Sequence, residues 1–464
     1  MSTSMGNGCV YGSPNVGNGN NVRNINPAGN VNNNNANNSN GVAPDCGKSQ
    51  HVVNPSGSNP EHSRKERLSR SSAEGDEQID IDAVSFHEAG TAIYNALSPR
   101  EKICSFEELY KAVFICKRNV MWKDSVAGFV KNALVNCYNL HHELMNDTYK
   151  LSPYSVFVVH EKKTRTIVST RMRDRVVQRS LCDNYLTEYL TKSFIYDNCA
   201  CLPGRGTDMA RNRLKCHLQR FYRKHGLNGW VLKVDIHDFF GSTPHDVVKA
   251  AVAKRIPDPW VREQVYTIVD SFDHIAPDKG MGLGSQITQL VQLAVLDDLD
   301  HYIKEVLRIK GYVRYMDDFI LIHEDKEHLK RCLVEITRIL ADLGLELNEK
   351  KTGIQPVKNG IHFLGFSFRL TDTGKVLQTV LHKKISKERR KLRKLVDRVN
   401  AGEMTRQHVD ECYQAWRAHV CKGNCQSLLS RMDSYYVELF GEPIQKEKKD
   451  SSYTHLFMGF IEEG

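Results

Sequence analysis

Two stretches far apart in the sequence place carboxylates directly at the end of apolar runs. Asp317 and Asp318 interrupt the largely apolar residues 311–323, and Asp235 ends an apolar run that begins at Trp230. This pattern predicts a strand, a tight turn and a strand around the Asp pair, and a second strand that ends at Asp235. Adjacent carboxylates at the tip of a buried hairpin cannot both stay ionised without a compensating cation. Mg²⁺, which prefers hard oxygen ligands, is the natural candidate.

An acidic hairpin turn in solvent is the alternative interpretation, because turns favour Asp. The return strand, residues 319–322, is however fully apolar, which an exposed turn does not require. If the two carboxylate sites converge, a pair of metal ions about 4 Å apart could bind the attacking and leaving oxygens of an in-line phosphoryl displacement. The residues alone therefore indicate nucleotidyl transfer.

Six blocks of the sequence, in order, resemble the motifs of reverse transcriptases. Residues 315–318 (Tyr-Met-Asp-Asp) resemble the YxDD box, and residues 235–240 resemble the first palm motif. The other blocks resemble the fingers (one block in two segments, 161–167 and 173–178), the template and nucleotide loop (280–289), the late palm (347–352) and the primer grip (363–366). The resemblance extends over roughly residues 85–440, and so many ordered blocks are specific.

The resemblance implies an α+β right-hand polymerase with fingers, a palm and a helical thumb. We expect residues 81–150 to form a helical N-terminal lobe, 151–370 the fingers and palm, and 371–445 the thumb, followed by a tail at 446–464. Within the lobe, Trp122, Phe129 and Tyr138 have helical spacing and are expected to be core residues. Residues 1–80 form a leader and linker that we expect to be disordered.

The same resemblance assigns roles to the carboxylates. Asp235 and Asp317 are expected to bridge two Mg²⁺ ions, for which Mn²⁺ is the substitute ion, and the backbone carbonyl of Ile236 adds an oxygen ligand. Asp318 is the third catalytic and metal-site carboxylate. We expect its role to be more peripheral, because successive side chains of a strand point in different directions.

Four further residues are expected to contact the incoming nucleotide. Lys163 and Arg165 lie in a basic turn and would neutralise the triphosphate as charge builds on the pyrophosphate. A basic turn is usually a solvated surface, and only the position of this turn among the ordered blocks favours the functional role. Phe240 has the position of the sugar gate, where a bulky ring excludes a ribose 2′-OH and selects dNTPs. Lys351 is expected to protonate the leaving pyrophosphate.

The expected template and nucleotide loop departs from the common family pattern. Many reverse transcriptases have Pro-Gln-Gly where this chain has Gly282, Leu283 and Gly284. The reverse transcriptases of diversity-generating retroelements carry an aliphatic residue there, followed by Ser-Gln where this chain has Thr288 and Gln289. Leu283, Gly284 and Gln289 are expected to line the nucleotide pocket. The side chain of Leu283 cannot form the directional hydrogen bond of an amide, so we expect the pocket to select the incoming nucleotide by shape. The enzyme is then expected to copy with lower fidelity.

Several residues are expected to contact the nucleic acid. Residues 383–398 contain nine Lys or Arg against two acids, with apolar residues on one helical face. This pattern suits a thumb helix along a duplex, although a calmodulin-binding or membrane-surface helix has the same pattern. The expected contacts are Arg205 with the template backbone, Phe363, Leu364 and Gly365 with the primer 3′ end, and Arg389, Arg390, Arg393 and Lys394 with the duplex.

The leader has an unusual composition. Fourteen of the twenty-six residues from 15 to 40 are Asn. One interpretation is a low-complexity tail that cannot offset its ordering entropy. The other is that residues 1–46 are a translated template repeat of a diversity-generating retroelement, in which a template repeat is copied with errors at adenines. Asn codons begin with two adenines, so a template rich in adenine would be translated as an Asn-rich segment.

Composition and charge limit the choice of partners. A net charge of +9 suits a polyanionic partner, and thirteen cysteines without paired spacing suit a reducing, cytoplasmic environment. The chain contains no apolar run of about 18 residues, so we expect no membrane span.

We therefore expect an RNA-directed DNA polymerase that extends a DNA or RNA primer on template RNA from dNTPs. The favoured context is error-prone copying in a diversity-generating retroelement, with a small basic accessory protein as a further partner. A retron, group II intron-like or phage-defence reverse transcriptase is the second interpretation. The third is an inactive palm that serves as an RNA-binding scaffold, which the intact Asp235, Asp317 and Asp318 disfavour.

Overall fold

The computed structural model describes residues 94, 96–160, 164–272, 277–282 and 284–444. The leader and the C-terminal tail lie outside these residues, as do Lys163 and Leu283. Arg165 lies in a described strand, but only its backbone is described.

A four-stranded antiparallel sheet carries both carboxylate stretches, in the order β4-β5-β3-β6. Most residues of its central strands are buried, which explains why these segments are nearly continuous apolar runs. Helix α8 (Thr207–His225) lies along β4, and α14 (Lys326–Asp342) contacts β3, β5 and β6. The four strands are β3 (Trp230–Asp235), β4 (Gly311–Tyr315), β5 (Asp318–His323) and β6 (Gly353–Pro356). The expected strand, turn and strand around the Asp pair is thus confirmed.

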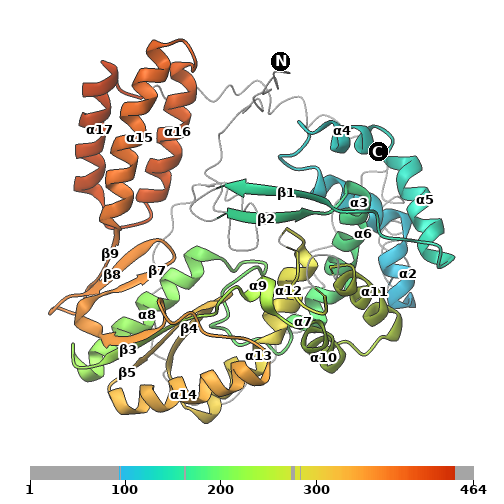
Figure 1. Ribbon diagram of the computed structural model, residues 1–464, viewed down its shortest axis with the longest axis horizontal. Coiled ribbons are helices and arrows are strands. Elements are labelled where there is room, and N and C mark those ends of the chain that lie inside the picture. Colours follow the sequence, from blue (N-terminus) through green and yellow to red (C-terminus); the bar gives the residue numbers. More distant parts are fainter. Residues whose placement is uncertain (1–93, 95, 161–163, 273–276, 283, 445–464) are drawn as a thin grey trace, which may run out of the picture.

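The sheet lies between two largely helical regions (Figure 1). On one side, β7 (Ile361–Phe363), β8 (Phe366–Leu370) and β9 (Val376–Val380) form a three-stranded antiparallel sheet that leads into a bundle of three helices. The bundle consists of α15 (His382–Asn400), α16 (Arg406–Val420) and α17 (Gln426–Phe440). Leu392 and Leu395 of α15 are buried, and the basic residues between them are exposed, as expected for an amphipathic helix.

On the other side, the hairpin of β1 (Ser155–His160) and β2 (Thr164–Ser169) extends from a helical region toward the bundle (Figure 1). The helices of this region and of the adjoining middle part are α2 (Pro99–Cys104), α3 (Phe106–Cys116), α4 (Asp124–Lys131), α5 (Ala133–Met145), α6 (Met172–Leu181), the π-helical turn Cys182–Leu186, α7 (Thr187–Thr191), α9 (Phe239–Ser242), α10 (His245–Arg255), α11 (Pro259–Asp270), α12 (Gln286–Val295), α13 (Asp297–His301) and a second π-helical turn, Tyr302–Val306. Within the described ranges, every helix is too short or too polar to cross a bilayer.

The expectation that Trp122 and Tyr138 are core residues is wrong. Trp122 lies in the turn before α4 and is 69% exposed, and Tyr138 is 57% exposed. The cause is the orientation of α5, which buries Cys137, Leu140 and Leu144 and therefore turns Tyr138 outward. Phe129 is partly buried against the core, as expected.

Candidate active site

Pairing of the central strands brings the three carboxylate residues to one end of the sheet. In the antiparallel register of β3 and β5, Asp235 lies opposite Asp318. The backbone N–H of Ile236 donates to the carbonyl oxygen of Asp317 at 3.1 Å, which joins the end of β3 to the turn between β4 and β5. The residues that carry the carboxylates in the two distant stretches therefore lie next to each other, as their positions after apolar strands suggested.

A buried arginine stabilises the turn that carries Asp317. Met316 has a φ of 56°, a left-handed conformation that is rare for a non-glycine residue. Arg314 Nη1 donates to the carbonyl oxygen of Met316 at 3.1 Å. Its Nε and Nη2 lie 2.7 and 2.6 Å from the two carboxylate oxygens of Asp300, which also accepts the hydroxyl of Tyr312 at 2.6 Å. This ion pair is completely buried.

Sequence reasoning missed this arginine. The one available signal was a charged side chain inside the otherwise apolar strand β4, since a buried Arg requires a partner. The partner, Asp300, comes from α13 and could not be identified from sequence spacing.

Asp235 is held by residues that follow α14. The backbone N–H of Asn348 donates to the carbonyl oxygen of Asp235 at 2.8 Å, and the hydroxyl of Thr352 accepts from the N–H of Asp235 at 3.3 Å. These bonds bring the expected late-palm motif beside the carboxylate. The Nζ of Lys351 then lies 2.6 Å from each carboxylate oxygen of Asp235, whose side chain is only 7% exposed.

Asp318 has a different environment. Its Oδ2 lies 3.4 Å from Lys233 Nζ, and its Oδ1 is buried without a hydrogen-bond partner. The pKa of Asp318 is raised to about 7, mainly because burial disfavours the charged form. The charge of Lys233 opposes this rise, whereas the carboxylates of Asp317 and Asp235 add to it. The strand ends therefore concentrate negative charge that a cation would stabilise.

The residues at this end of the sheet fit a divalent metal ion in chemical type. Carboxylates and backbone carbonyls are the oxygen ligands that Mg²⁺ prefers, and the buried, unpartnered Oδ1 of Asp318 is a free acceptor. Across the described segments, no three Asp, Glu, His or Cys side chains are drawn together closely enough to form a ready-made metal site. In this structure the ammonium group of Lys351 provides the positive charge next to the carboxylate of Asp235.

The expected sugar-gate and nucleotide-loop residues lie side by side. Phe240 is 6% exposed, and its carbonyl oxygen accepts the N–H of Met281 at 2.6 Å. Gly280 has a φ of 84°, and a Cβ there would lie 2.9 Å from the carbonyl oxygen of Gly241, so this approach requires glycine. Gly284 also has a positive φ, of 122°, whereas Gln289 points into the protein and is 2% exposed.

The expected nucleic-acid contacts are spread over several elements. Phe363 ends β7, and Leu364 and Gly365 form the turn to β8 with φ values of 44° and 86°. The guanidinium of Arg205 donates to the carbonyls of Ile195 and Asn198, at 3.0 and 2.7 Å, so it stabilises the preceding turn. Arg389, Arg390, Arg393 and Lys394 are exposed on α15, and Arg389 also lies over the ring of Tyr435.

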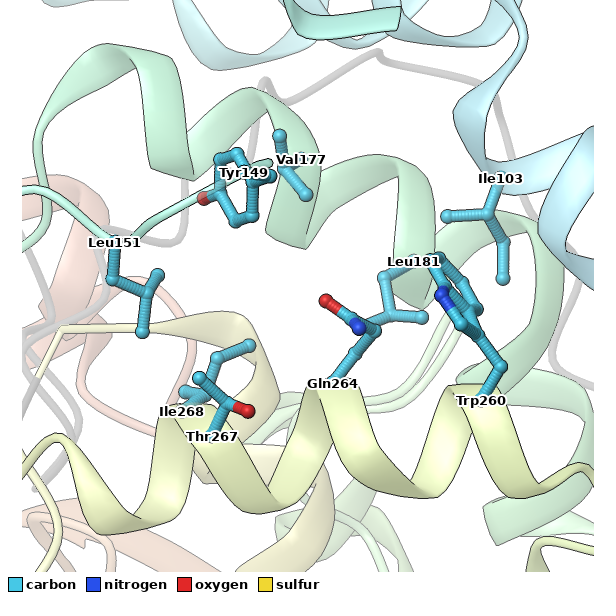
Figure 2. A pocket seen from close by; sticks show the side chains of 9 residues that line it. All are labelled: Ile103, Tyr149, Leu151, Val177, Leu181, Trp260, Gln264, Thr267 and Ile268. Atoms are coloured by element: carbon cyan, nitrogen blue, oxygen red, sulfur yellow. The ribbon is translucent and has the colours of Figure 1, made fainter. Parts of the chain in front are cut away.

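A small cavity lies away from these residues, between α2, α6 and α11 (Figure 2). Its volume is about 10 Å³, which is enough for about one water molecule. The indole Nε1 of Trp260 is buried at its edge without a protein acceptor. This cavity is too small for a nucleotide.

Comparison with known proteins decides the family of the central region. Residues 157–368 match the family model described as reverse transcriptase (RNA-dependent DNA polymerase). The chain carries a reverse transcriptase domain. The matched region includes β3, β4 and β5 with all three carboxylates, and the matched family is described as one of RNA-dependent DNA polymerases.

Individual relatives of the reverse transcriptase domain are distant. Protein YkfC of Escherichia coli (strain K12) is 24% identical over 271 residues, which cover 49% of this chain and 69% of that protein. Among solved structures, telomerase from Candida albicans, in complex with a fragment of telomeric RNA, is similar with a TM-score of 0.41 and 13% identity, over 50% of this chain and 46% of the telomerase chain. Apo telomerase from Candida tropicalis is similar with a TM-score of 0.38 and 13% identity, over 49% of each chain. The chain thus spans about half of the length of these telomerases.

Proposed function

We propose that this protein synthesises DNA on an RNA template, extending a DNA or RNA primer from dNTPs. The observation that carries the proposal is the meeting of Asp235, Asp317 and Asp318 at one end of the central sheet, inside a reverse transcriptase domain. An inactive RNA-binding scaffold would have no need to hold this concentration of negative charge at the strand ends.

Asp235 and Asp317 would hold two Mg²⁺ ions, or Mn²⁺ in their place, with the carbonyl of Ile236 as a further ligand. When bound, such ions stabilise the attacking and leaving oxygens of an in-line nucleotidyl transfer. Asp318 would add to the negative potential from a more peripheral position, next to Lys233. Lys351 would move from Asp235 to the nucleotide phosphates and donate a proton to the leaving pyrophosphate.

The remaining residues would select and orient the substrates. Phe240 would exclude a ribose 2′-OH. The hydrogen bond between Phe240 and Met281 supports a nucleotide loop next to this ring. Gly284 would belong to the same loop. The burial of Gln289 indicates that it would act by supporting this loop from within. Lys163, Arg165 and Leu283 would contact the nucleotide. Phe363, Leu364 and Gly365 would contact the primer end. The nucleic-acid backbone would be contacted by basic residues, which are Arg205, Arg389, Arg390, Arg393 and Lys394.

In this proposal the elements take the parts of a right-hand polymerase. The β1–β2 hairpin and its neighbouring helices would be the fingers, the four-stranded sheet with α8 and α14 the palm, and α15–α17 the thumb. The helices α2–α5 would be the N-terminal lobe. The described bundle ends with α17 at Phe440.

The experiment that tests this function is primer extension by the purified full chain. With an RNA template, a labelled DNA primer, dNTPs and Mg²⁺, the primer should lengthen to the template end, and chelation of the metal should stop it. Failure to extend any primer on RNA, with the chain folded, would contradict the proposal.

Error-prone copying in a diversity-generating retroelement is the finer proposal, supported by Leu283 and by the Asn-rich leader. A small basic accessory protein would be a further partner in that context. Sequencing of cDNA made on a defined RNA should then show errors concentrated at template adenines, and Leu283→Gln should reduce them. Uniform errors or accurate copying would favour the retron, group II intron-like or phage-defence alternative. Deletion of residues 1–46 should leave extension intact if they are a translated repeat.

A further inference from the structure

The outward-facing side of α8 carries positive charge and no carboxylate. Leu214, Leu218 and Phe221 are buried against the protein, and the opposite side of the helix is polar. The residues on that opposite side recur at helical spacing and are Asn212, Lys215, Cys216, Gln219, Arg220, Arg223 and Lys224. Four of these seven residues are Lys or Arg and none is Asp or Glu. We call the four cations, which are Lys215, Arg220, Arg223 and Lys224, the α8 basic face.

The other two cations of α8 are paired, whereas those of the α8 basic face are not. Arg211 pairs with Asp208, and Arg213 Nε lies 2.7 Å from Asp197 Oδ1. In the part of the chain that the structure describes, no carboxylate forms an ion pair with any side chain of the α8 basic face. Burial and the charge of Arg211 lower the pKa of Lys215, and Asp208 only partly opposes them. The described residues therefore leave the positive charge of this face uncompensated.

Most of the α8 basic face lies toward the end of the central sheet that is opposite the carboxylates. A Cβ on Gly229, the residue before β3, would lie 2.1 Å from the ring of Phe221, so the second half of α8 contacts the start of β3. Strand β3 runs from Trp230 at this end to Asp235 at the other, and five residues of a strand span roughly 17 Å. The cations within 220–224 are therefore too far from Asp235 to contact a nucleotide bound there.

The turn between β8 and β9 borders α8 and leaves its positive charge in place. The hydroxyl of Tyr222 donates to the carbonyl oxygen of Asp372. A Cβ on Gly374 would lie 2.6 Å from the ring of Tyr222, so the turn contacts the helix closely. Asp372 is the one acidic residue of this turn, and Lys375, which is also exposed, offsets its charge. The turn therefore does not neutralise the α8 basic face.

The composition of this face fits the phosphate backbone of RNA better than a membrane surface. Lys and Arg side chains bind phosphates without reading the bases. Lys215 and Lys224 are nine residues apart, which is roughly 14 Å along a helix and long enough for more than one phosphate of a strand. A helix that lies on a membrane turns an apolar side toward the lipid, but the apolar side of α8 is buried in the protein.

We propose that the α8 basic face binds the phosphate backbone of the template RNA outside the stretch that is held at the carboxylates. The choice of template RNA rests on the function proposed above. This second contact would retain a long RNA on the protein without touching the reacting atoms. Affinity should therefore depend on how much RNA extends beyond the primer–template duplex.

The test compares the full-length chain with the triple variant Arg220→Gln, Arg223→Gln, Lys224→Gln, whose three positions are exposed. Equilibrium binding is measured against salt concentration for a compact primer–template hairpin and for the same hairpin with single-stranded RNA added at both ends. For the extended RNA, the slope of log K against log salt should fall by about 2, because each lost phosphate contact removes about 0.7. Affinity for the hairpin and its rate of extension should stay unchanged.

A matched control removes three exposed cations from α14, by Lys330→Gln, Arg331→Gln and Arg338→Gln. These cations are paired with acidic residues of α14 or of its N-cap, so binding of the extended RNA should change little. The control has the same net charge as the α8 variant. A general effect of net charge would therefore weaken RNA binding equally in both.

Four results would each overturn the proposal. They are an unchanged salt slope in an α8 variant with a normal melting temperature, an equal loss in the α14 control, an equal loss for the hairpin, and binding to phosphatidylserine vesicles that requires the α8 cations while RNA binding does not. Because binding is measured without dNTPs, these results are separate from a failure of primer extension.

Discussion

The Nζ of Lys351 lies 2.6 Å from both carboxylate oxygens of Asp235. A nearly buried carboxylate requires a positive partner, and here a lysine provides it from the segment between α14 and β6. Because a metal ion at Asp235 would take the same place, loading of the metal and release of Lys351 are expected to be coupled. Release would free the ammonium group for the nucleotide phosphates.

Lys351→Met should therefore strengthen divalent-metal binding while weakening catalysis. Without the competing ammonium group, Mn²⁺ affinity of the nucleotide-free protein, measured by electron paramagnetic resonance, should rise several-fold. Primer extension should fall by roughly 10²- to 10³-fold if Lys351 also acts as the general acid. Lys350→Met, which removes the exposed neighbour, is the matched control. Unchanged Mn²⁺ affinity in Lys351→Met would show that the lysine does not compete with the metal.

The buried Arg314–Asp300 pair should position the turn of Asp317. Removal of one partner leaves an uncompensated buried charge, so Arg314→Met should cost about 3–5 kcal/mol of folding free energy. The double variant Arg314→Met, Asp300→Leu should recover much of that stability but little of the extension rate, because the hydrogen bond to the Met316 carbonyl is still missing. Chemical denaturation and single-turnover extension measure the two quantities. Full recovery of the rate in the double variant would mean that the pair serves stability alone.

The sequence predicted the elements of the active site better than the contacts between them. Asp235 and Asp317–Asp318 could be located because each follows an apolar strand, and pairing of these strands required only that they share a sheet. The partners Lys351 and Asp300 could not be assigned, since they depend on how α13 and the segment after α14 lie against the sheet. Burial of Gln289 was likewise unpredictable from the motif, because helix orientation decides which face is covered.

Phe240→Ala should raise incorporation of rNTPs relative to dNTPs, because the ring would no longer exclude the 2′-OH. Both Phe239 and Phe240 are almost completely buried, so either truncation should cost about 3–5 kcal/mol of stability. Phe239→Ala is therefore a control with a matched core defect, and its selectivity should equal that of the original protein. Competition between rNTPs and dNTPs in single-nucleotide extension gives the ratio. Equal ratios of rNTP to dNTP incorporation in both variants would show that another residue excludes the 2′-OH.

His419 should make folding sensitive to pH between about 6.5 and 4, because burial and neighbouring positive charges lower its pKa to about 4. The unfolded histidine has an ordinary pKa and binds a proton in this window, whereas the folded imidazole stays neutral until about pH 4. Stability should therefore fall as the pH is lowered from 6.5 to 4, by at most about 3 kcal/mol, and level off below that. The groups that face His419 are Lys384, Arg211, Lys422 and Asp208.

Denaturation curves measured between pH 6.5 and 4 test whether the free energy of unfolding falls as the pH is lowered. His419→Gln should flatten the dependence, whereas His382→Gln, at an exposed position, should not. A steeper loss of stability in His419→Gln than in the original protein would contradict the prediction.

The most direct test of the central claim is primer extension by Asp317→Asn on an RNA template with dNTPs and Mg²⁺. If Asp317 holds the metal ions, the rate should fall by several orders of magnitude while affinity for the primer–template duplex changes little. Asp298→Asn, which alters an exposed carboxylate on α13, should extend normally. Extension by Asp317→Asn within about tenfold of the original rate, a change of about 1.4 kcal/mol in barrier, would contradict the catalytic assignment.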